Sequence, residues 1–576
     1  MRRFSLRRVL VCLWALAPAA MAAGPADDLL GLVPADSGLT LAVEDLRDRT
    51  REIGDSPLVR ELRRIPDVQT WLGSERFRQF DRAARDIRGA LGISLGTIRD
   101  EVIGDAVVLA LKPGPPDKPD QARGLLLARP RDRGVVESML KSLNQAQMNA
   151  GEMLGVDART RGDVRYAVRR FKPGGRPEEY YVHLEGGAFA WSNSEEMILG
   201  VIDRRLKGGP GLGGAPAFRK ARGALPERPL ASLFVNPRLL ERAMSDAPRT
   251  GQPTQDRLAA MLIRYVAAVE QAGIALEWRD GFVLHSHEVI APEKLDPWLR
   301  RWLTRPPSAP TLPAQLPPTA IAVVSASVDL DALREAAWEL TPDDVRPSLD
   351  NIRLGLQGIL LGRDPVTDVL PRLGPGLLLY LDAEPGRGVR PHFPVIGAVG
   401  WSDRPGAHDL AAPLDNALRT AFALYALDPK RATAHLRVQD QVIGDARMTE
   451  LTDGLKVRMA YRADRNRLVV GNSAEAVARF ATGGPPATLA AVRARYFPDA
   501  ETFAIVDLER LAREIDTYRG PIARGLAARS KRPVASVDRD LSLVLAVARL
   551  FRAATITSAA SAGAAEIHRT IGLIAR

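Results

Sequence analysis

The sequence contains very little cysteine, since Cys12 is the single thiol among 576 residues. Cys12 lies in an N-terminal segment that we expect to be removed, so the mature chain should contain none. A chain without thiols excludes internal disulfides, thiolate zinc sites and cysteine nucleophiles. An exported protein of this kind must be held together by the packing of its core.

The first 22 residues have the pattern of a signal peptide. Four arginines come before the apolar residues 9–17, and Ala20-Met21-Ala22 fits the small-x-small cleavage rule, which makes Ala23 the expected mature start. The alternative is a retained membrane anchor. We favour cleavage, because a spanning helix needs about 20 apolar residues and Pro18 ends this run. The predicted location is therefore periplasmic or secreted, with no transmembrane anchor after cleavage.

The net charge is +11, and loss of the four signal arginines lowers it to +7. The chain is 46% hydrophobic and 26% charged, which is a globular composition. The densest basic segments, residues 165–176 and 524–532, are interpreted as solvated faces and not as a nucleic-acid site. We therefore expect no nucleic-acid partner.

One short pattern occurs twice. In residues 189–196 and again in 468–475, an apolar run leads through Asn-Ser into a helical pattern. Ser194 and Ser473 are predicted N-caps, and Glu196 and Glu475 add negative charge to the first turn. The repeat predicts a duplicated protein.

Further landmarks extend the repeat. Ser94 and Asp364 lie 270 residues apart, as do Gly104 and Gly374. The offset rises to 279 between the two serines above and falls to 272 at the later prolines, so the first half has seven extra residues near the glycine-rich segment 208–214. The predicted organisation is a signal peptide (1–22), a first repeat (23–304), a Pro-rich linker (305–316) and a second repeat (317–576).

Strand-like runs come in groups, and helical patterns separate the groups. Short Gly/Asp turns, such as the one within residues 277–282, favour antiparallel hairpins. This order predicts an α+β fold in which each half is a curved, mainly antiparallel sheet with helices on one face. Long helices are expected over residues 56–90, 135–147, 257–271 and 541–552.

Three patterns resemble sites. Gly92-Ile93-Ser94-Leu95-Gly96 matches the nucleophile elbow, but helical residues precede Ser94 and its repeat partner Asp364 suggests a shared capping role. Residues 209–214 fit G-x-G-x-x-G but follow a helix, so a flexible surface loop is favoured over a dinucleotide site. His285 and His287 lie on one side of a strand, as half of a metal site would, without an evident third ligand.

The paired acids Asp343-Asp344 and Glu195-Glu196 lie at helix starts, where first-turn acids are routine. Trp191, Trp278 and Trp401 lie in strands and are interpreted as core or sheet-face residues. The sequence therefore assigns no catalytic, cofactor-binding or metal-binding residue, and no cofactor.

The Pro-Ala-Asp-Ser start, the Gly-Asp-Ala-Val-Val strand and the Ser-Asn-Ser helix start resemble a family of exported bacterial proteins known only as a domain of unknown function. The family has Leu-Pro-Ala-Asp-Thr-type strand starts and the same Ser-Asn-Ser strand-to-helix step. The resemblance implies an exported α+β domain and no catalytic residue.

Three functions stay open. The favoured one is a non-enzymatic envelope protein that binds a protein partner or an apolar ligand on a concave sheet or in a cleft between the halves. The second is a hydrolase of envelope material that uses Asp and Glu groups brought together only in the fold. The third is a purely structural role in the envelope.

Overall fold

The computed structural model describes residues 24–114, 118, 121–174, 176–238, 251–304, 312–383, 393–402, 404–427, 435–453, 457–498, 500, 502–561, 563 and 565–576. The predicted signal peptide lies outside the described residues. The described residues form two compact units: those within 1–49 and 83–219 form unit 1, and those within 50–82 and 220–576 form unit 2. Within the described ranges, no helix combines the length and the apolar character that crossing a membrane requires. The predicted division into repeats at 23–304 and 317–576 stays a prediction.

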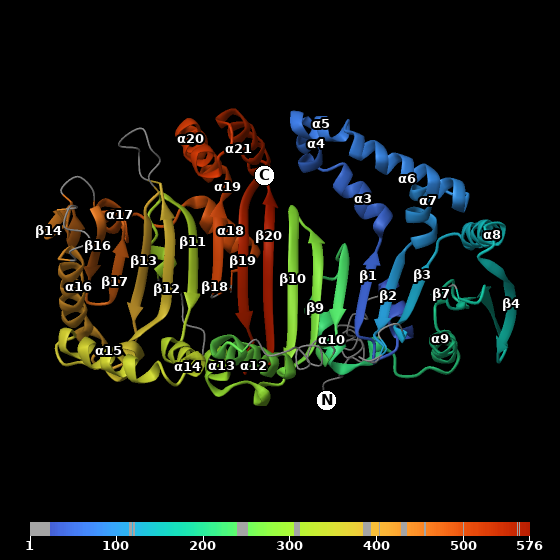
Figure 1. The fold of residues 1–576 in the computed structure, drawn as a ribbon, viewed down its shortest axis with the longest axis horizontal. Helices are drawn as coiled ribbons and strands as arrows, with labels where there is room; N and C mark the ends of the chain where they lie inside the picture. The colour runs from blue at the N-terminus through green and yellow to red at the C-terminus, as the bar shows by residue number, and fades with distance from the viewer. Residues whose placement is uncertain are drawn as a thin grey trace, which may run out of the picture. The chain divides into compact units, whose positions relative to one another are not determined.

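Unit 1 contains an antiparallel sheet in the order β1-β2-β3-β7-β6-β5-β4, of which Figure 1 labels β1, β2, β3, β7 and β4. Its strands are β1 (Leu39–Glu44), β2 (Ala106–Lys112), β3 (Arg123–Arg129), β4 (Met153–Arg161), β5 (Val164–Phe171), β6 (Glu179–His183) and β7 (Phe189–Ser192).

Unit 2 contains a larger antiparallel sheet in the order β8-β9-β10-β20-β19-β18-β11-β12-β13-β17-β16-β15-β14. The antiparallel α+β fold is confirmed. Its strands are β8 (Ala231–Val235), β9 (Val269–Trp278), β10 (Gly281–Ile290), β11 (Ala320–Ser327), β12 (Leu373–Asp382), β13 (Val395–Trp401), β14 (Arg437–Ile443), β15 (Ala446–Thr452), β16 (Val457–Ala463), β17 (Arg467–Gly471), β18 (Thr502–Asp507), β19 (Phe551–Ala560) and β20 (Glu566–Ala575).

Helices connect the groups of strands. The α-helices are α2 (Pro25–Leu32), α3 (Leu46–Gly54), α4 (Pro57–Arg64), α5 (Pro66–Leu72), α6 (Glu75–Leu91), α7 (Leu95–Thr97), α8 (Arg133–Asn149), α9 (Glu195–Lys207), α10 (Pro216–Gly223), α12 (Pro253–Ala268), α13 (Pro297–Leu303), α14 (Leu330–Leu340), α15 (Arg346–Ile359), α16 (Ala411–Ala426), α17 (Ala474–Arg479), α18 (Ala487–Tyr496), α19 (Leu508–Thr517), α20 (Arg519–Ser530) and α21 (Val534–Ala548). Short 3-10 or π turns are η1 (Ile98–Ile103), η3 (Leu212–Gly214), η4 (Pro292–Lys294), η5 (Leu312–Gln315), η6 (Pro365–Val369), η7 (Leu370–Arg372) and η8 (Ala407–Leu410).

The hairpin predicted within residues 277–282 is confirmed, with Trp278 opposite Phe282. Its turn places Asp280 at φ 51° and Gly281 at φ 134°, conformations that Asp tolerates and Gly adopts freely. Two helix boundaries were predicted wrongly. Helix α12 was expected to reach residue 271 but ends at Ala268, and β9 begins at Val269. Helix α21 was expected to reach residue 552 but ends at Ala548, and β19 begins at Phe551. In both places the last residues of the helical pattern belong to a strand of the sheet.

One face of the unit 2 sheet is covered by helices. Val323, Tyr380, Ile396 and Ile505 are each at most 2% exposed and pack in one core cluster with residues of α17 and α18. Part of the predicted linker also packs here. Leu312, the first residue of η5, and Leu316, which follows η5, belong to the same cluster, while residues 305–311 lie outside the described ranges.

Unit 1 has a buried cation at its core. Arg169 on β5 is 1% exposed, and its Nε donates to Asn144 Oδ1 of α8 at 2.8 Å. The guanidinium also bonds to Glu179 and Gln147, and it lies 4.9 Å from the ring centroid of Trp191. Burial lowers the pKa of Arg169. Arg169 therefore ties α8 to the sheet, and the prediction that residues 165–176 form a solvated face is wrong at this position.

Substitution Arg169→Met should lower the free energy of unfolding by about 3 kcal/mol, because it leaves buried polar partners unsatisfied. Urea unfolding followed by tryptophan fluorescence measures this. Arg170→Met is the matched control, since Arg170 is 49% exposed and pairs only with Asp157 among described residues; its effect should stay within about 0.5 kcal/mol. Equal effects of the two substitutions would contradict the assignment.

Candidate functional site

The repeated strand-to-helix corner is held by its asparagine. Asn193 Oδ1 accepts a hydrogen bond from Gly124 N at 2.8 Å, and Asn472 Oδ1 accepts one from Val395 N at 2.8 Å. Each asparagine thereby fixes the end of its strand to the start of the neighbouring strand. The corner is the turn from β7 to α9 in unit 1 and from β17 to α17 in unit 2, as the strand-to-helix pattern predicted.

The two serines of this corner differ. Ser473 Oγ accepts from Ala476 N at 3.2 Å, so its capping role is confirmed. Ser194 occupies the N-cap position of α9 but makes no side-chain cap bond. The N-cap position is therefore as predicted, but the expected bond from the serine hydroxyl to the first turn is not made. The Ser192 hydroxyl instead accepts a bond from the Ser194 amide at 3.0 Å, and β17 has Gly471 at the place of Ser192.

Ser94 and Asp364 are both helix N-caps, as predicted. Ser94 Oγ accepts from Thr97 N at 3.0 Å, and Asp364 Oδ1 accepts from Val366 N at 2.8 Å. A π turn follows at each place, namely η1 and η6. Ser94 has ordinary extended backbone angles (φ −76°, ψ 159°) and follows helix α6, which excludes the strained strand-to-helix turn of a nucleophile elbow.

Substitution Ser94→Asp should leave stability within about 0.5 kcal/mol of the parent, because aspartate caps as well as serine, whereas Ser94→Ala should cost about 1 kcal/mol. Thermal unfolding of the three proteins measures the difference. A hydrolase activity that Ser94→Asp abolishes without loss of stability would contradict a purely capping role.

The glycine-rich segment 209–214 follows helix α9, as expected, but it is not a loose surface loop. A Cβ on Gly211 would lie 1.9 Å from the Gly31 carbonyl oxygen, and Leu212 N donates to Val33 O at 2.8 Å. The glycines allow the chain to pack against the end of α2. The prediction of a flexible loop is therefore wrong in this respect.

Three histidines lie side by side on β10 and β20. The ring of His568 lies 5.7 Å from that of His285 and 6.1 Å from that of His287. The Nε2 atoms of His285 and His287 are held by Glu277 at 3.0 Å and Glu566 at 2.8 Å. In the described ranges, no group of three or more His, Cys, Asp or Glu side chains is arranged to hold a metal.

The His568 ring titrates far from its usual range. Burial, followed by repulsion from His285 and His287, lowers the pKa of His568 from 6.5 to about 4. Between these values the unfolded chain binds a proton that the folded chain does not, so stability falls as pH falls from about 6.5 to 4.

The variant His568→Gln should reduce the slope of the free energy of unfolding against pH by up to about 1.4 kcal/mol per pH unit. This is the slope that one proton, bound only by the unfolded chain, produces. Urea unfolding at several pH values between 4 and 7 measures the slope. His408→Gln is the control, because His408 lies on η8 away from this cluster. An unchanged slope in His568→Gln would contradict the assignment.

Both acids at the start of α9, Glu195 and Glu196, are hydrogen-bonded to other side chains. Glu195 accepts from the Tyr166 hydroxyl and from Arg159, both at 2.6 Å, and the Tyr166 bond lowers the pKa of Glu195. Proton donation to a leaving group at neutral pH needs a raised pKa. The carboxyls with a shifted pKa in the described ranges are all shifted downward: Glu137, Glu195, Asp203, Asp364, Asp440, Asp538 and Glu566.

The feature with the clearest binding character is the second face of the unit 2 sheet. Residues directly opposite one another on antiparallel strands lie on the same face. One such line of partners, which we call the apolar row, crosses eight neighbouring strands without a polar side chain: Leu284, Ile571, Ile556, Ala504, Val324, Leu379, Gly397 and Val470.

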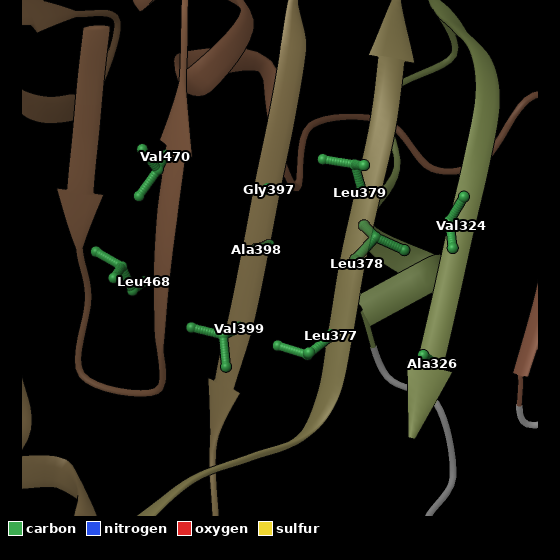
Figure 2. Close-up of a pocket in the computed structure, with 10 residues that line it drawn as sticks. All are labelled: Val324, Ala326, Leu377, Leu378, Leu379, Gly397, Ala398, Val399, Leu468 and Val470. Carbon is green, nitrogen blue, oxygen red and sulfur yellow. The ribbon is translucent and has the colours of Figure 1, made fainter. Parts of the chain in front are cut away.

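The apolar row is open in its middle part. Ile556 is 55% exposed, Leu379 49% and Val324 47%. Around Leu379 the face forms a shallow hollow of about 410 Å³ over β11, β12, β13 and β17. Figure 2 shows only hydrocarbon side chains among the ten residues that line this hollow.

A helix closes the row at one end. Beyond Val470 the next partner is Tyr461 on β16, which is 1% exposed. Helix α16 covers Tyr461: the rings of Phe422 and Tyr461 lie 5.4 Å apart, and the Tyr461 hydroxyl donates to Asp415 Oδ1 at 2.9 Å. The row is therefore closed at its Val470 end, whereas beyond Leu284 the apolar partners Leu276 and Ala231 continue the line onto β9 and β8.

We did not predict these residues from the sequence, although a signal was present. An antiparallel strand with one wet face alternates apolar and polar residues. Residues 320–324 and 377–381 are apolar without alternation, the pattern of strands buried on both faces. The structure covers only one of those faces.

No family model matches the chain, and no match is found among curated proteins or solved structures.

Proposed function

We propose that this protein is an exported, non-enzymatic lipid-binding protein whose apolar row receives the acyl chains of a diacyl lipid. Contiguous apolar patches on a soluble protein mark surfaces that bind other molecules. The observation that carries the proposal is the uninterrupted apolar row, half-exposed at Val324, Leu379 and Ile556.

The dimensions of the row suit acyl chains. Eight strands about 4.8 Å apart span roughly 33 Å, which is long enough for two acyl chains lying end to end, since two such chains fill the ~30 Å hydrocarbon thickness of a bilayer. An acyl chain that lies on an open face is removed from water on about one side only. Each of its methylenes therefore contributes about 0.4 kcal/mol to the binding free energy, half the value for full burial. Two chains of 12 methylenes then gain about 10 kcal/mol, against at least about 4 kcal/mol for lost freedom. Diacyl lipids should bind, and single chains only weakly.

We propose further that the chain consists of two copies of one ten-stranded pattern, consistent with the exported family that the sequence resembles. The order β1-β2-β3-β7-β6-β5-β4 in unit 1 has the same pattern as β11-β12-β13-β17-β16-β15-β14 in unit 2. The paired caps, π turns and asparagine corners support this. Leu109, 270 residues before Leu379, is 44% exposed at the same place in its strand.

The test is transfer of a fluorescent phosphatidylcholine, labelled on one acyl chain, from vesicles to the purified protein. A zwitterionic lipid removes any contribution from the basic net charge. The triple variant Val324→Thr/Leu379→Thr/Ile556→Thr places threonine, a β-branched residue that suits strands, at each position and makes the row polar. We expect it to lower lipid binding at least tenfold.

The double variant Leu154→Thr/Val156→Thr is the matched control, since it changes exposed residues on β4 in unit 1 and should bind as the parent does. Equal lipid binding by the triple variant and the parent would refute the proposal. So would light scattering that shows a dimer which the triple variant dissociates, because the row would then be an interface between two copies of the chain.

A further inference from the structure

A second apolar site lies on the covered face of the same sheet. A pocket of about 400 Å³ opens between α18, η5 and the strands β11 and β18. Its walls include Leu316, Val323, Leu489, Phe503 and Ile505. Val323 is the neighbour of Val324, and successive residues of a strand point to opposite faces. The pocket is therefore separate from the apolar row.

A single charged residue lines this pocket. Arg493 of α18 places its guanidinium 5.0 Å from the ring centroid of Phe503. Its Nε atom is shielded from solvent and has no hydrogen-bond partner in the part of the chain that the structure describes. The ion pairs of the described residues do not include Arg493, whereas Arg495 on the same helix pairs with Asp280. A shielded donor without a partner is costly.

We propose that this pocket binds a medium-chain carboxylate, with its head on Arg493 and its tail among the apolar walls. The planar guanidinium matches a carboxylate in two parallel hydrogen bonds, which its two terminal nitrogens can donate. A volume of about 400 Å³ holds about a dozen groups of ~30 Å³ each, the size of decanoate. This inference goes beyond the proposed function, because it concerns another face of the sheet and a single-chain anion.

Calorimetric titration of the full-length protein with decanoate tests the site, with decanol as the uncharged comparison. Loss of a charge-assisted hydrogen bond corresponds to roughly a 10- to 100-fold change in affinity. We therefore expect decanoate to bind, decanol to bind at least tenfold more weakly, and Arg493→Met to lower decanoate affinity by the same factor. Arg495→Met should leave it unchanged.

A second variant makes the test independent of any effect of Arg493 on folding. Ala490 is exposed on α18 and lines the pocket, so Ala490→Trp should fill the pocket and abolish decanoate binding while circular dichroism stays native. No decanoate binding by the parent, equal binding of decanol, or full binding by Arg493→Met or Ala490→Trp would each overturn the proposal. The triple variant of the apolar row should still bind decanoate, which separates the two sites.

Discussion

The structure of unit 2 depends on one constraint: its central strands are apolar on both faces, while helices cover only one of them. Val323 is 2% exposed and Val324 is 47% exposed, although they are chemically identical neighbours. Helices α17 and α18 seal the face that includes Val323. The other face leaves apolar surface in water, which costs stability in the free protein and is tolerated most readily where a ligand or partner covers it.

The sequence predicts much of the local structure. The hairpin within residues 277–282 was predicted from its Gly/Asp turn, and the caps at Ser94, Asp364 and Ser473 were predicted from residue types that satisfy the free amides of a first helical turn. Such features depend on a few consecutive residues. The order of strands depends on pairings between residues far apart, such as β10 with β20 or β11 with β18, and no local pattern encodes those.

The candidate site could not be predicted from the sequence, because it too depends on pairings between distant strands. Leu284 and Leu379 belong to one row only because five successive strand pairings bring their strands into register. The composition of each strand shows that both faces are apolar, but it does not show which face a helix will cover. Arg493 was also missed, since an arginine in a helical segment is usually solvated. Its role as the single charge among apolar walls follows from the packing of α18 on β18.

Register links the two proposed sites. On β11 and β18, alternate residues line the covered pocket and the open row: Val323 and Ile505 face α18, while Val324 and Ala504 face the row. A slip of the ladder by one residue would exchange the two sets. The pairing is fixed outside the sites as well, because Asp507 caps α19 through the Arg510 amide at 2.9 Å and Arg510 bonds to the Pro318 carbonyl at 2.6 Å. Some of the contacts that fix this register therefore lie at the ends of the strands, outside the apolar middle of both faces.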